Sequence, residues 1–206
     1  LEVYTMNLFE GCMGKNLTSK LQWLEEPSEW NFAQDSLEIT PTGETDFFRP
    51  SDRPAKDNAC LLFTTLEGNF TAQVYATTEL VAFGDAAAIT IYSSPVLWAK
   101  LCIERSPVGE VSIVSVVTNP WSDDANNELL QKPESYLRIT RKGQVLGMHY
   151  SLDGMHWRFV RTMTCAMPAQ VKVGVQAQAP FKAGCRATFE AFQLCPEPVA
   201  NFRSGE

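Results

Sequence analysis

The amino-acid sequence predicts an all-β protein, folded as a jelly-roll sandwich of two antiparallel sheets. Three observations lead to this prediction. About ten to twelve short strand patterns follow one another closely, no segment has the apolar spacing of an amphipathic helix, and an Asp-Gly turn at 153–154 lies between two strand patterns. Helices between the strands would indicate alternating βα units, whereas short, closely spaced strands are typical of sandwiches and jelly rolls.

The N-terminal part of the chain contains few clear strand patterns. Residues 1–20 match no element, and the stretch 23–30 is expected to be an irregular approach because Pro27 cannot lie inside a helix. Residues 36–40 alternate between polar and apolar side chains and predict the first short strand, which ends at a Pro-Thr-Gly turn.

Strand patterns then follow at short intervals to the C-terminal region. The longest polar interruption, residues 120–133, is expected to be a surface loop with one helical turn, and residues 50–58 a second polar loop. Residues 59–64 are apolar, and strands are expected at 69–77, 86–92, 98–104, 111–118, 136–141, 145–150, 157–162, 171–177 and 187–194.

A central hairpin, residues 98–119, carries the most unusual pattern. Its first strand alternates, and one face holds Trp98, Lys100, Cys102 and Glu104. A Ser-Pro-Val-Gly turn follows, and the second strand is β-branched and mostly apolar, as expected of a central strand. The first strand therefore places charged side chains on a sheet that should be buried, and this polar face is the leading candidate for a site.

Length and composition predict one domain over residues 1–206, with a core at about 23–194 and a flexible tail after 196, because no linker divides the chain. The net charge of −7, without a block of lysine or arginine, argues against a nucleic-acid or anionic-membrane partner. No apolar run approaches the roughly 20 residues that span a bilayer.

The six cysteines contain no CxxC pair, so neither a zinc ribbon nor a thioredoxin-type motif is expected. We interpret them as reduced thiols, and the predicted compartment is the cytoplasm. Two Asn-x-Thr triplets, at Asn16 and Asn69, and the absence of an initial methionine keep a secreted protein as the alternative.

Several short motifs resemble the uncharacterised regulation-of-enolase protein family and, more distantly, the concanavalin A-like domain at the C-terminus of family-43 β-xylosidases. The matching pieces are 45–48, 70–72, Asp85, 98–104, 115–119, 122–123, 137–141, 150–157 and 173–175. The resemblance implies a concanavalin A-like sandwich with a concave groove. It implies no activity, because a shared fold does not itself confer sugar binding or hydrolysis.

Carboxylates are the first candidates for chemistry, since a glycosidase needs two of them on either side of one bond. The candidates at motif positions are Asp46, Asp85, Glu104, Asp123 and Asp153. On its face of the strand, Glu104 follows Lys100 and Cys102 at intervals of two residues. No second acid shares this alternation with Glu104, which argues against hydrolysis. We expect Glu104 to form an ion pair with Lys100 or with an arginine across the sheet. Asp153 is interpreted as a turn residue that caps backbone N–H groups.

The sequence predicts no metal site and no cofactor. The acidic loop 122–128 lacks the glycine of an EF-hand, and the two histidines, His149 and His156, form no ligand cluster. Phosphate-binding and dinucleotide fingerprints are absent.

The leading hypothesis is a lectin-like, non-catalytic module that binds a carbohydrate or another small polar ligand. The predicted ligand-binding residues are Trp98, Lys100, Glu104, Asp46, Asp85, Asp123, Arg138, Arg141 and Tyr150. A carbohydrate-active enzyme with paired carboxylates is the second hypothesis. The third is a protein partner, as a regulator of a metabolic enzyme, which would require an exposed apolar patch.

Overall fold

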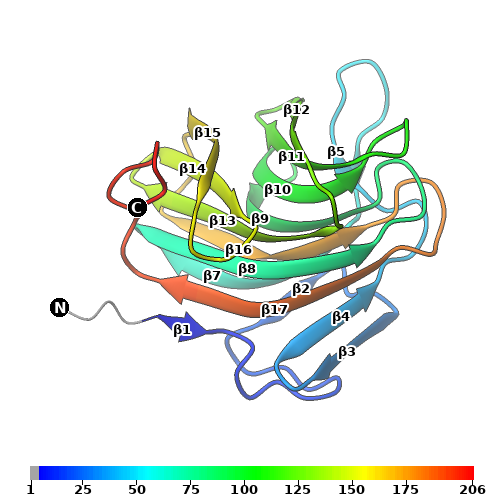
Figure 1. Ribbon diagram of the computed structural model, residues 1–206, viewed down its shortest axis with the longest axis horizontal. Helices are drawn as coiled ribbons and strands as arrows, with labels where there is room; N and C mark the ends of the chain where they lie inside the picture. The colour runs from blue at the N-terminus through cyan, green and yellow to red at the C-terminus, as the bar shows by residue number, and fades with distance from the viewer. Residues whose placement is uncertain (1–4) are drawn as a thin grey trace.

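A computed structural model describes residues 5–206, which form two large antiparallel sheets packed face to face (Figure 1). The prediction of an all-β sandwich is confirmed. The eight-stranded sheet has the order β15 (Arg158–Thr164), β14 (Val145–Ser151), β13 (Glu134–Lys142), β8 (Phe70–Glu79), β17 (Arg186–Cys195), β4 (Ser36–Thr40) and β3 (Glu29–Ala33), and β1 (Met6–Asn7) also pairs with β17. The seven-stranded sheet has the order β12 (Ser122–Leu129), β11 (Val111–Thr118), β10 (Leu97–Arg105), β9 (Ala86–Ser94), β16 (Gln170–Gln178), β7 (Cys60–Glu67) and β2 (Gln22–Leu24). A separate pair joins β5 (Phe47–Phe48) to β6 (Lys56–Asp57).

The core between the sheets is built by the alternation of each strand. In β8, Phe70, Ala72, Val74 and Ala76 are buried and face the apolar residues of the other sheet. Burial of each large apolar side chain stabilises the fold by roughly 1.5–3 kcal/mol. All six cysteines are free thiols and five are buried, so they contribute to the fold as small apolar residues.

The seven-stranded sheet is buried on both of its faces over its central strands. Its inner face contributes to the main core, whereas Ala88, Tyr92, Trp98 and Cys102 on its outer face form a second apolar cluster with Phe47. The segment around β5 lies beside β10 and β11 and covers this face (Figure 1). This cover explains why a strand with charged residues can lie deep in the fold.

The polar stretch 120–133 is not the loop expected, because residues 122–129 form the edge strand β12. Its register places Asp124 opposite Val116 and Asn126 opposite Val114 of β11. An edge strand tolerates polar side chains on both faces, since much of it contacts solvent, and charges there discourage further pairing. The sequence pattern lacked the β-branched residues that mark buried strands.

The stretch 23–30 is also more regular than expected. Residues 22–24 form β2 against β7, and residues 29–33 form β3 against β4. Such short strands are recognised only through their partners, which is why the structure has more strands than the sequence predicts.

Both predicted hairpin turns are present. The carboxylate of Asp153 accepts hydrogen bonds from the backbone N–H groups of Met155 and His156, each at 2.8 Å, as expected of a turn residue. Gly154 has φ +75°, a backbone conformation that favours glycine. In the central hairpin, Trp98 lies opposite Thr118 and Glu104 opposite Ser112.

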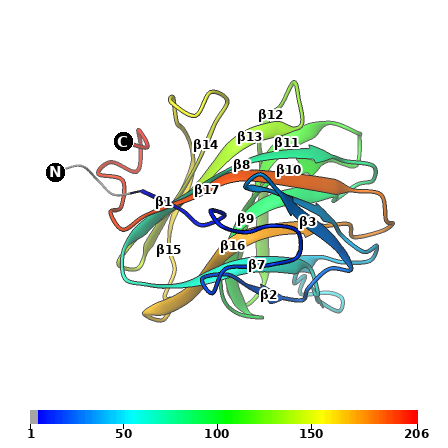
Figure 2. The same ribbon diagram turned by 90° about the horizontal axis from the view of Figure 1, so that it is seen from below.

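The C-terminal residues pack over the outer face of the eight-stranded sheet, whereas the sequence predicts a flexible tail. Arg138 donates to the carbonyl of Gly205 at 2.8 Å, and a ring nitrogen of His149 lies 2.7 Å from the carbonyl of Phe202. This segment and β1 lie at the same end of the molecule in both views (Figures 1 and 2). Residues 5–206 contain no helix long and apolar enough to cross a membrane.

Candidate functional site

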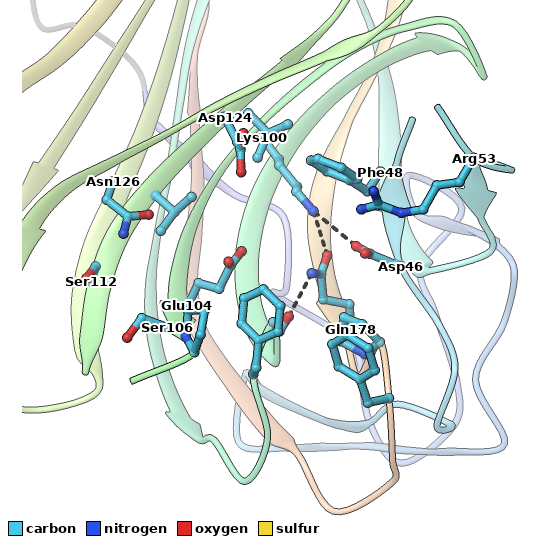
Figure 3. Close-up of a pocket in the computed structure, with 17 residues that line it drawn as sticks. Asp46, Phe48, Arg53, Lys100, Glu104, Ser106, Ser112, Asp124, Asn126 and Gln178 are labelled. Atoms are coloured by element: carbon cyan, nitrogen blue, oxygen red, sulfur yellow. Dashed lines mark hydrogen bonds and ion pairs between the residues drawn. The ribbon is translucent and has the colours of Figure 1, made fainter. Parts of the chain in front are cut away.

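A pocket of about 390 Å³ opens on the outer face of the seven-stranded sheet. Strands β10, β11 and β12 and the end of β16 supply its floor and one wall. The segment 46–53 and the loops at 83–84, 106–107 and 180–181 complete the rim. Figure 3 shows that the labelled polar side chains converge on this space from both sides. The pocket therefore coincides with the polar face of the central hairpin.

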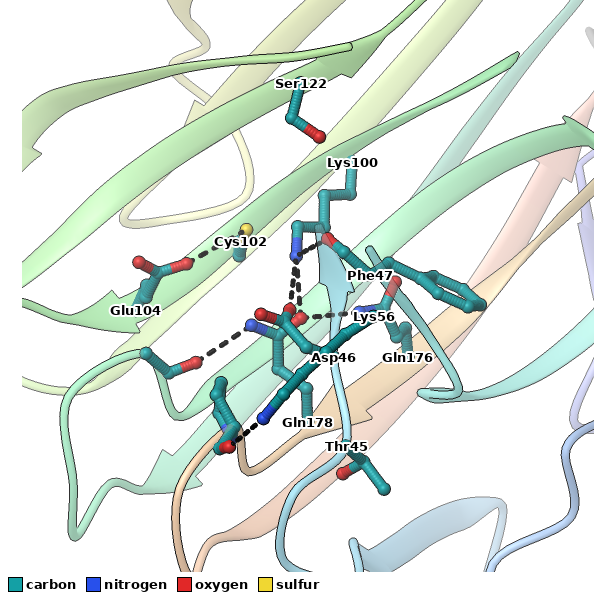
Figure 4. Close-up of polar contacts among 12 residues, drawn as sticks. Thr45, Asp46, Phe47, Lys56, Lys100, Cys102, Glu104, Ser122, Gln176 and Gln178 are labelled. Carbon is teal, nitrogen blue, oxygen red and sulfur yellow. Dashed lines mark hydrogen bonds and ion pairs between the residues drawn. The ribbon is translucent and has the colours of Figure 1, made fainter. Parts of the chain in front are cut away.

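Lys100 lies at the floor of the pocket, and its side chain is 1% exposed. Its ammonium donates to the Gln178 side chain at 2.7 Å and to the carbonyl of Phe47 at 2.9 Å, and it pairs with Asp46 at 3.4 Å (Figure 4). Burial lowers the pKa of Lys100, but the Asp46 carboxylate and its acidic neighbours outweigh burial, so the net pKa is raised. Lys100 therefore stays charged, with its ammonium held by the protein.

A chain of amides continues this network away from Lys100. The side-chain N–H₂ of Gln178 donates to the carbonyl of Gly84 at 2.9 Å, and Gln176 donates to the Gln178 oxygen at 2.8 Å. Thr90 donates to Gln176 at 2.9 Å. The floor is thus a connected set of satisfied polar groups, which holds its geometry before any ligand arrives.

Glu104 lies on the pocket wall and is partly buried, and it does not form the expected ion pair with Lys100. No lysine, arginine or histidine of residues 5–206 pairs with its carboxylate, because the Lys100 ammonium is directed to Asp46 and Gln178. Burial raises the pKa of Glu104 to about 7, with Lys100 opposing and with Asp46 and Asp124 adding to the rise.

This raised pKa predicts a pH dependence of stability. The folded state binds more protons than the unfolded state between pH 4.5 and about 7, so the free energy of unfolding should fall as pH rises through this window. The loss in the free energy of unfolding attributable to Glu104 should be on the order of 3 kcal/mol. Denaturant unfolding should show Glu104→Gln more stable than wild type at pH 8 and no more stable at pH 5. An equal difference at both pH values would contradict the prediction, and Glu67→Gln, a glutamate outside the pocket, provides the control.

The mouth of the pocket combines polar groups with aromatic rings. Asp124 and Asn126 are exposed on β12 and face the pocket, since they lie opposite Val116 and Val114. Phe83 and Phe181 stack with their ring centroids 5.5 Å apart and are 45% and 60% exposed. Phe48 lies on the same rim, with the guanidinium of Arg53 at 6.0 Å from its ring. The mouth can therefore contact both polar and apolar parts of a ligand.

Of the residues predicted from the sequence, Asp46, Lys100 and Glu104 lie together in the pocket. Trp98 lies beneath them, fully buried, with its ring centroid 5.8 Å from that of Phe47. Asp85 is also fully buried, and its carboxylate accepts from the N–H groups of Val81 and Ala82 at 2.8 and 2.7 Å. Asp85 therefore shapes a rim loop without lining the pocket.

The other four predicted residues lie elsewhere. Asp123 faces away from the pocket and pairs with Arg161 at 3.5 Å. The hydroxyl of Tyr150 bonds to Glu128. Arg141 donates to the carbonyls of four residues, Gly143, Met167, Pro168 and Ala169.

Arg138 lies on the outer face of the opposite sheet, where its guanidinium stacks on Trp157 at 3.3 Å. The structure therefore divides the predicted set between two sheets and the core.

Sequence analysis missed Asp124, Asn126, Gln178 and the aromatic rim. Asp124 and Asn126 lie in the stretch that the sequence predicts to be a loop, and the alternation of faces along a strand separates Asp124 from Asp123. The repeated glutamines of β16 were a further signal, since Gln176 and Gln178 share a face with Lys172.

The described part of the chain holds no group of three or more histidine, cysteine, aspartate or glutamate residues placed to hold a metal ion. Cys102 lies beside Glu104, but burial raises its pKa far above the ordinary value, so it stays a protonated thiol.

Comparison with known proteins agrees with the resemblance seen in the sequence. The family described as "Protein of unknown function (DUF1349)" matches residues 23–197. Regulation of enolase protein 1 of Saccharomyces cerevisiae is 27% identical over 174 residues, which cover 84% of this chain and 87% of that protein. A crystal structure of a functionally unknown protein from Saccharomyces cerevisiae has a TM-score of 0.80 at 27% identity, covering 85% of this chain and 96% of that chain.

Two further structures share the fold. The GH43 protein BlXynB of Bacillus licheniformis has a TM-score of 0.70 at 19% identity, covering 94% of this chain but only 39% of that chain. Lectin I-B4 of Griffonia simplicifolia has a TM-score of 0.60 at 10% identity, covering 93% of this chain and 98% of the lectin. At these identities the likeness concerns the concanavalin A-like sandwich and not an activity.

Proposed function

This chain belongs to the DUF1349 family of proteins of unknown function, and we propose that it is a lectin-like module that binds a small, sugar-like polar ligand in its pocket without cleaving it. Such a ligand offers hydroxyl groups to polar side chains and an apolar ring face to aromatic side chains. Both kinds of partner lie around one opening.

The observation that carries this proposal is the preorganised floor of the pocket. Lys100 and Gln178 are almost fully buried, yet both line the pocket and are held by hydrogen bonds to the protein. Side chains that are already fixed lose little conformational entropy when a ligand binds. A pocket of about 390 Å³ is within the usual range for small-molecule sites.

The centre of the pocket argues for binding rather than hydrolysis. A glycosidase places two carboxyl groups on either side of the bond to be cleaved. Here the floor is a lysine, and Asp46 is paired with it, which leaves this carboxylate less available to act on a ligand.

One observation favours a second candidate, a carbohydrate-active enzyme. Glu104 has a pKa of about 7, as a general acid requires, and Asp124 lines the same pocket. This hypothesis requires hydrolysis of an aryl glycoside that Glu104→Gln abolishes. If wild type releases no product from a panel of aryl glycosides, the enzyme hypothesis is excluded for those linkages.

A protein partner remains the third candidate, because a relative is named as a regulator of enolase. Phe83 and Phe181 are exposed apolar residues at the pocket rim, and Val81 is exposed two residues before Phe83. Pull-down with Phe83→Ala/Phe181→Ala as the comparison would test this surface. For the compartment we propose the cytoplasm, because six free thiols suit a reducing environment.

Titration calorimetry against a panel of mono- and disaccharides tests the binding function. We expect saturable binding of at least one sugar, weakened about tenfold or more by Asn126→Ala, which removes a rim amide. Asp123→Asn is the matched control, since Asp123 is a neighbour on β12 whose side chain faces away from the pocket, and it should bind as wild type does. No binding of any sugar at millimolar concentration would overturn the proposal.

A further inference from the structure

We propose that the chain has a second binding site, on the outer face of the eight-stranded sheet, and that this site takes a small carboxylate with an apolar body. The site is a pocket of about 440 Å³ between strands β8, β13 and β17 and residues 197–200 and 205–206 of the C-terminal segment. This volume is within the usual range for small-molecule sites. The first pocket lies on the other sheet, so this proposal does not depend on the sugar-binding function.

A row of polar side chains crosses the floor of the second pocket. Arg138 of β13 lies opposite Gln73 of β8, and Gln73 lies opposite Gln193 of β17. All three line the pocket because neighbours along their strands, such as Leu137 and Val74, are buried in the core. Strand pairing therefore brings one planar polar group from each of three strands into a single line.

Arg138 is held in a fixed position at one end of this row. Its guanidinium stacks on Trp157 at 3.3 Å and donates to the carbonyl of Gly205 at 2.8 Å. Its Nε and Nη2 atoms donate to the side-chain oxygen of Gln73 at 3.1 and 2.8 Å. A guanidinium has five N–H groups, so two of those of Arg138 have no acceptor within residues 5–206.

The hydrogen bonds of the row determine which atoms remain for a ligand. Because arginine only donates, it holds the side-chain oxygen of Gln73 toward itself, and the N–H₂ group of Gln73 then donates to the oxygen of Gln193 at 2.8 Å. This leaves the N–H₂ group of Gln193 as the free end of the row, with no acceptor among the residues that the structure describes. Both ends of the row therefore offer donors, which match a ligand group that only accepts.

The charge of Arg138 favours an anion among such ligands. It is the one cation that lines the pocket, it is half-buried, and no aspartate or glutamate of residues 5–206 pairs with it. Burial lowers the pKa of Arg138 to about 10, with Cys195 opposing, so the guanidinium is charged at neutral pH. Glu197 and Glu206 line the wall of the C-terminal segment, but both are exposed, so their charges are screened by solvent. A ligand carboxylate would supply the missing counter-ion and accept charge-assisted hydrogen bonds.

The C-terminal wall of the pocket favours an apolar body behind the carboxylate. Pro198 and Val199 are partly buried and line the pocket together with Ala200. A short hydrocarbon chain would bury apolar surface against these residues, which stabilises the complex. An inorganic anion has no such surface, so phosphate is a poorer match than an aliphatic carboxylate.

Three probes test the proposal on the full chain by titration calorimetry: hexanoate, hexanamide and inorganic phosphate. Hexanamide has the shape of hexanoate without its charge, and phosphate has the charge without the hydrocarbon chain. We expect hexanoate to bind at least about tenfold tighter than either, because hydrogen bonds between charged partners are the stronger ones. In NMR spectra, hexanoate should shift the side-chain amide signals of Gln73 and Gln193 and leave that of Asn126, in the first pocket, unchanged.

Two variants and a control examine the role of charge. Arg138→Gln should lose the preference for hexanoate over hexanamide, and circular dichroism verifies its fold. Arg186→Gln is the matched control, since it removes the same charge from a half-exposed residue of β17 outside this pocket, and it should keep the full preference. Glu206→Gln changes an exposed residue of the wall and removes a charge of the same sign as the ligand, so it should bind hexanoate at least as tightly as wild type.

Several results would overturn the carboxylate site. These are no binding of hexanoate at millimolar concentration, equal binding of hexanoate and hexanamide by wild type, a preference that survives in Arg138→Gln, and weaker binding by Glu206→Gln. Hexanoate binding that leaves the signals of Gln73 and Gln193 unchanged would place the ligand elsewhere and also overturn it. Phosphate binding as tight as that of hexanoate overturns the assignment of an apolar body. Failure of sugars to bind concerns the first pocket alone.

Discussion

Gly174→Ala should lower the free energy of unfolding by about 3–5 kcal/mol. This is the largest effect expected of a Gly→Ala substitution within residues 5–206, because the added Cβ has its shortest contact at this position. Gly174 lies in the middle of β16, between β9 and β7, opposite Thr90 and Phe63. A Cβ atom there would lie 2.1 Å from the carbonyl oxygen of Leu62 and 2.8 Å from the Cα of Phe63. Both are backbone atoms of the paired strand, so they cannot move aside without opening the sheet.

The measurement is thermal and denaturant unfolding of the two purified proteins. A loss of this size should lower the melting temperature by roughly 10 °C or more in a domain of this length. Gly147→Ala is the matched control, because Gly147 also lies within a strand, but its added methyl would meet the side-chain ring of Phe202 at 3.2 Å, which can shift. Equal stability of Gly174→Ala and wild type would contradict the close approach of β16 and β7.

Lys100→Met should have the second-largest effect and lower the free energy of unfolding by about 3 kcal/mol. Methionine fills most of the same space but cannot donate to Gln178, to the Phe47 carbonyl or to Asp46. The change would leave the Asp46 carboxylate, whose side chain is 15% exposed, without its cation. Most of the destabilisation should therefore come from unsatisfied partners and not from lost packing.

A double variant separates these two causes. Asp46→Asn in the Lys100→Met background should recover part of the lost stability, since it removes the unpaired charge. Lys172→Met is the control on the same face of the sheet, where the ammonium lies 5.4 Å from the rings of Phe63 and Tyr92, and it should cost less than about 1 kcal/mol. If Lys100→Met were as stable as Lys172→Met, the polar floor would not hold the pocket together.

The central hairpin shows how far sequence patterns reach. Alternation in residues 98–104 correctly placed Trp98, Lys100, Cys102 and Glu104 on one face of a buried strand. It also led to the pairing of Glu104 with Lys100, which is wrong, because the Lys100 ammonium turns to Asp46 on a segment 54 residues away in the sequence. Alternation predicts the face of a side chain, but not the segment that covers that face.

The edge strand β12 shows the opposite case. Its polar residues match no strand pattern, so the sequence favoured Asp123 within a loop, whereas pairing with β11 directs Asp124 and not Asp123 into the pocket. One step along a strand changes the face, and only the partner strand sets the register.

The sequence by itself determined the all-β sandwich, the two hairpins and the polar face of β10, because strand alternation and turn chemistry are local properties of the chain. The single-domain organisation over residues 1–206 stays a prediction. Only the tertiary structure decided which polar residues share a pocket, since Lys100, Gln178, Asp124 and the aromatic rim come from distant segments that meet through sheet pairing. The site is built from long-range contacts, and these depend on register and on the covering segment, which no local pattern encodes.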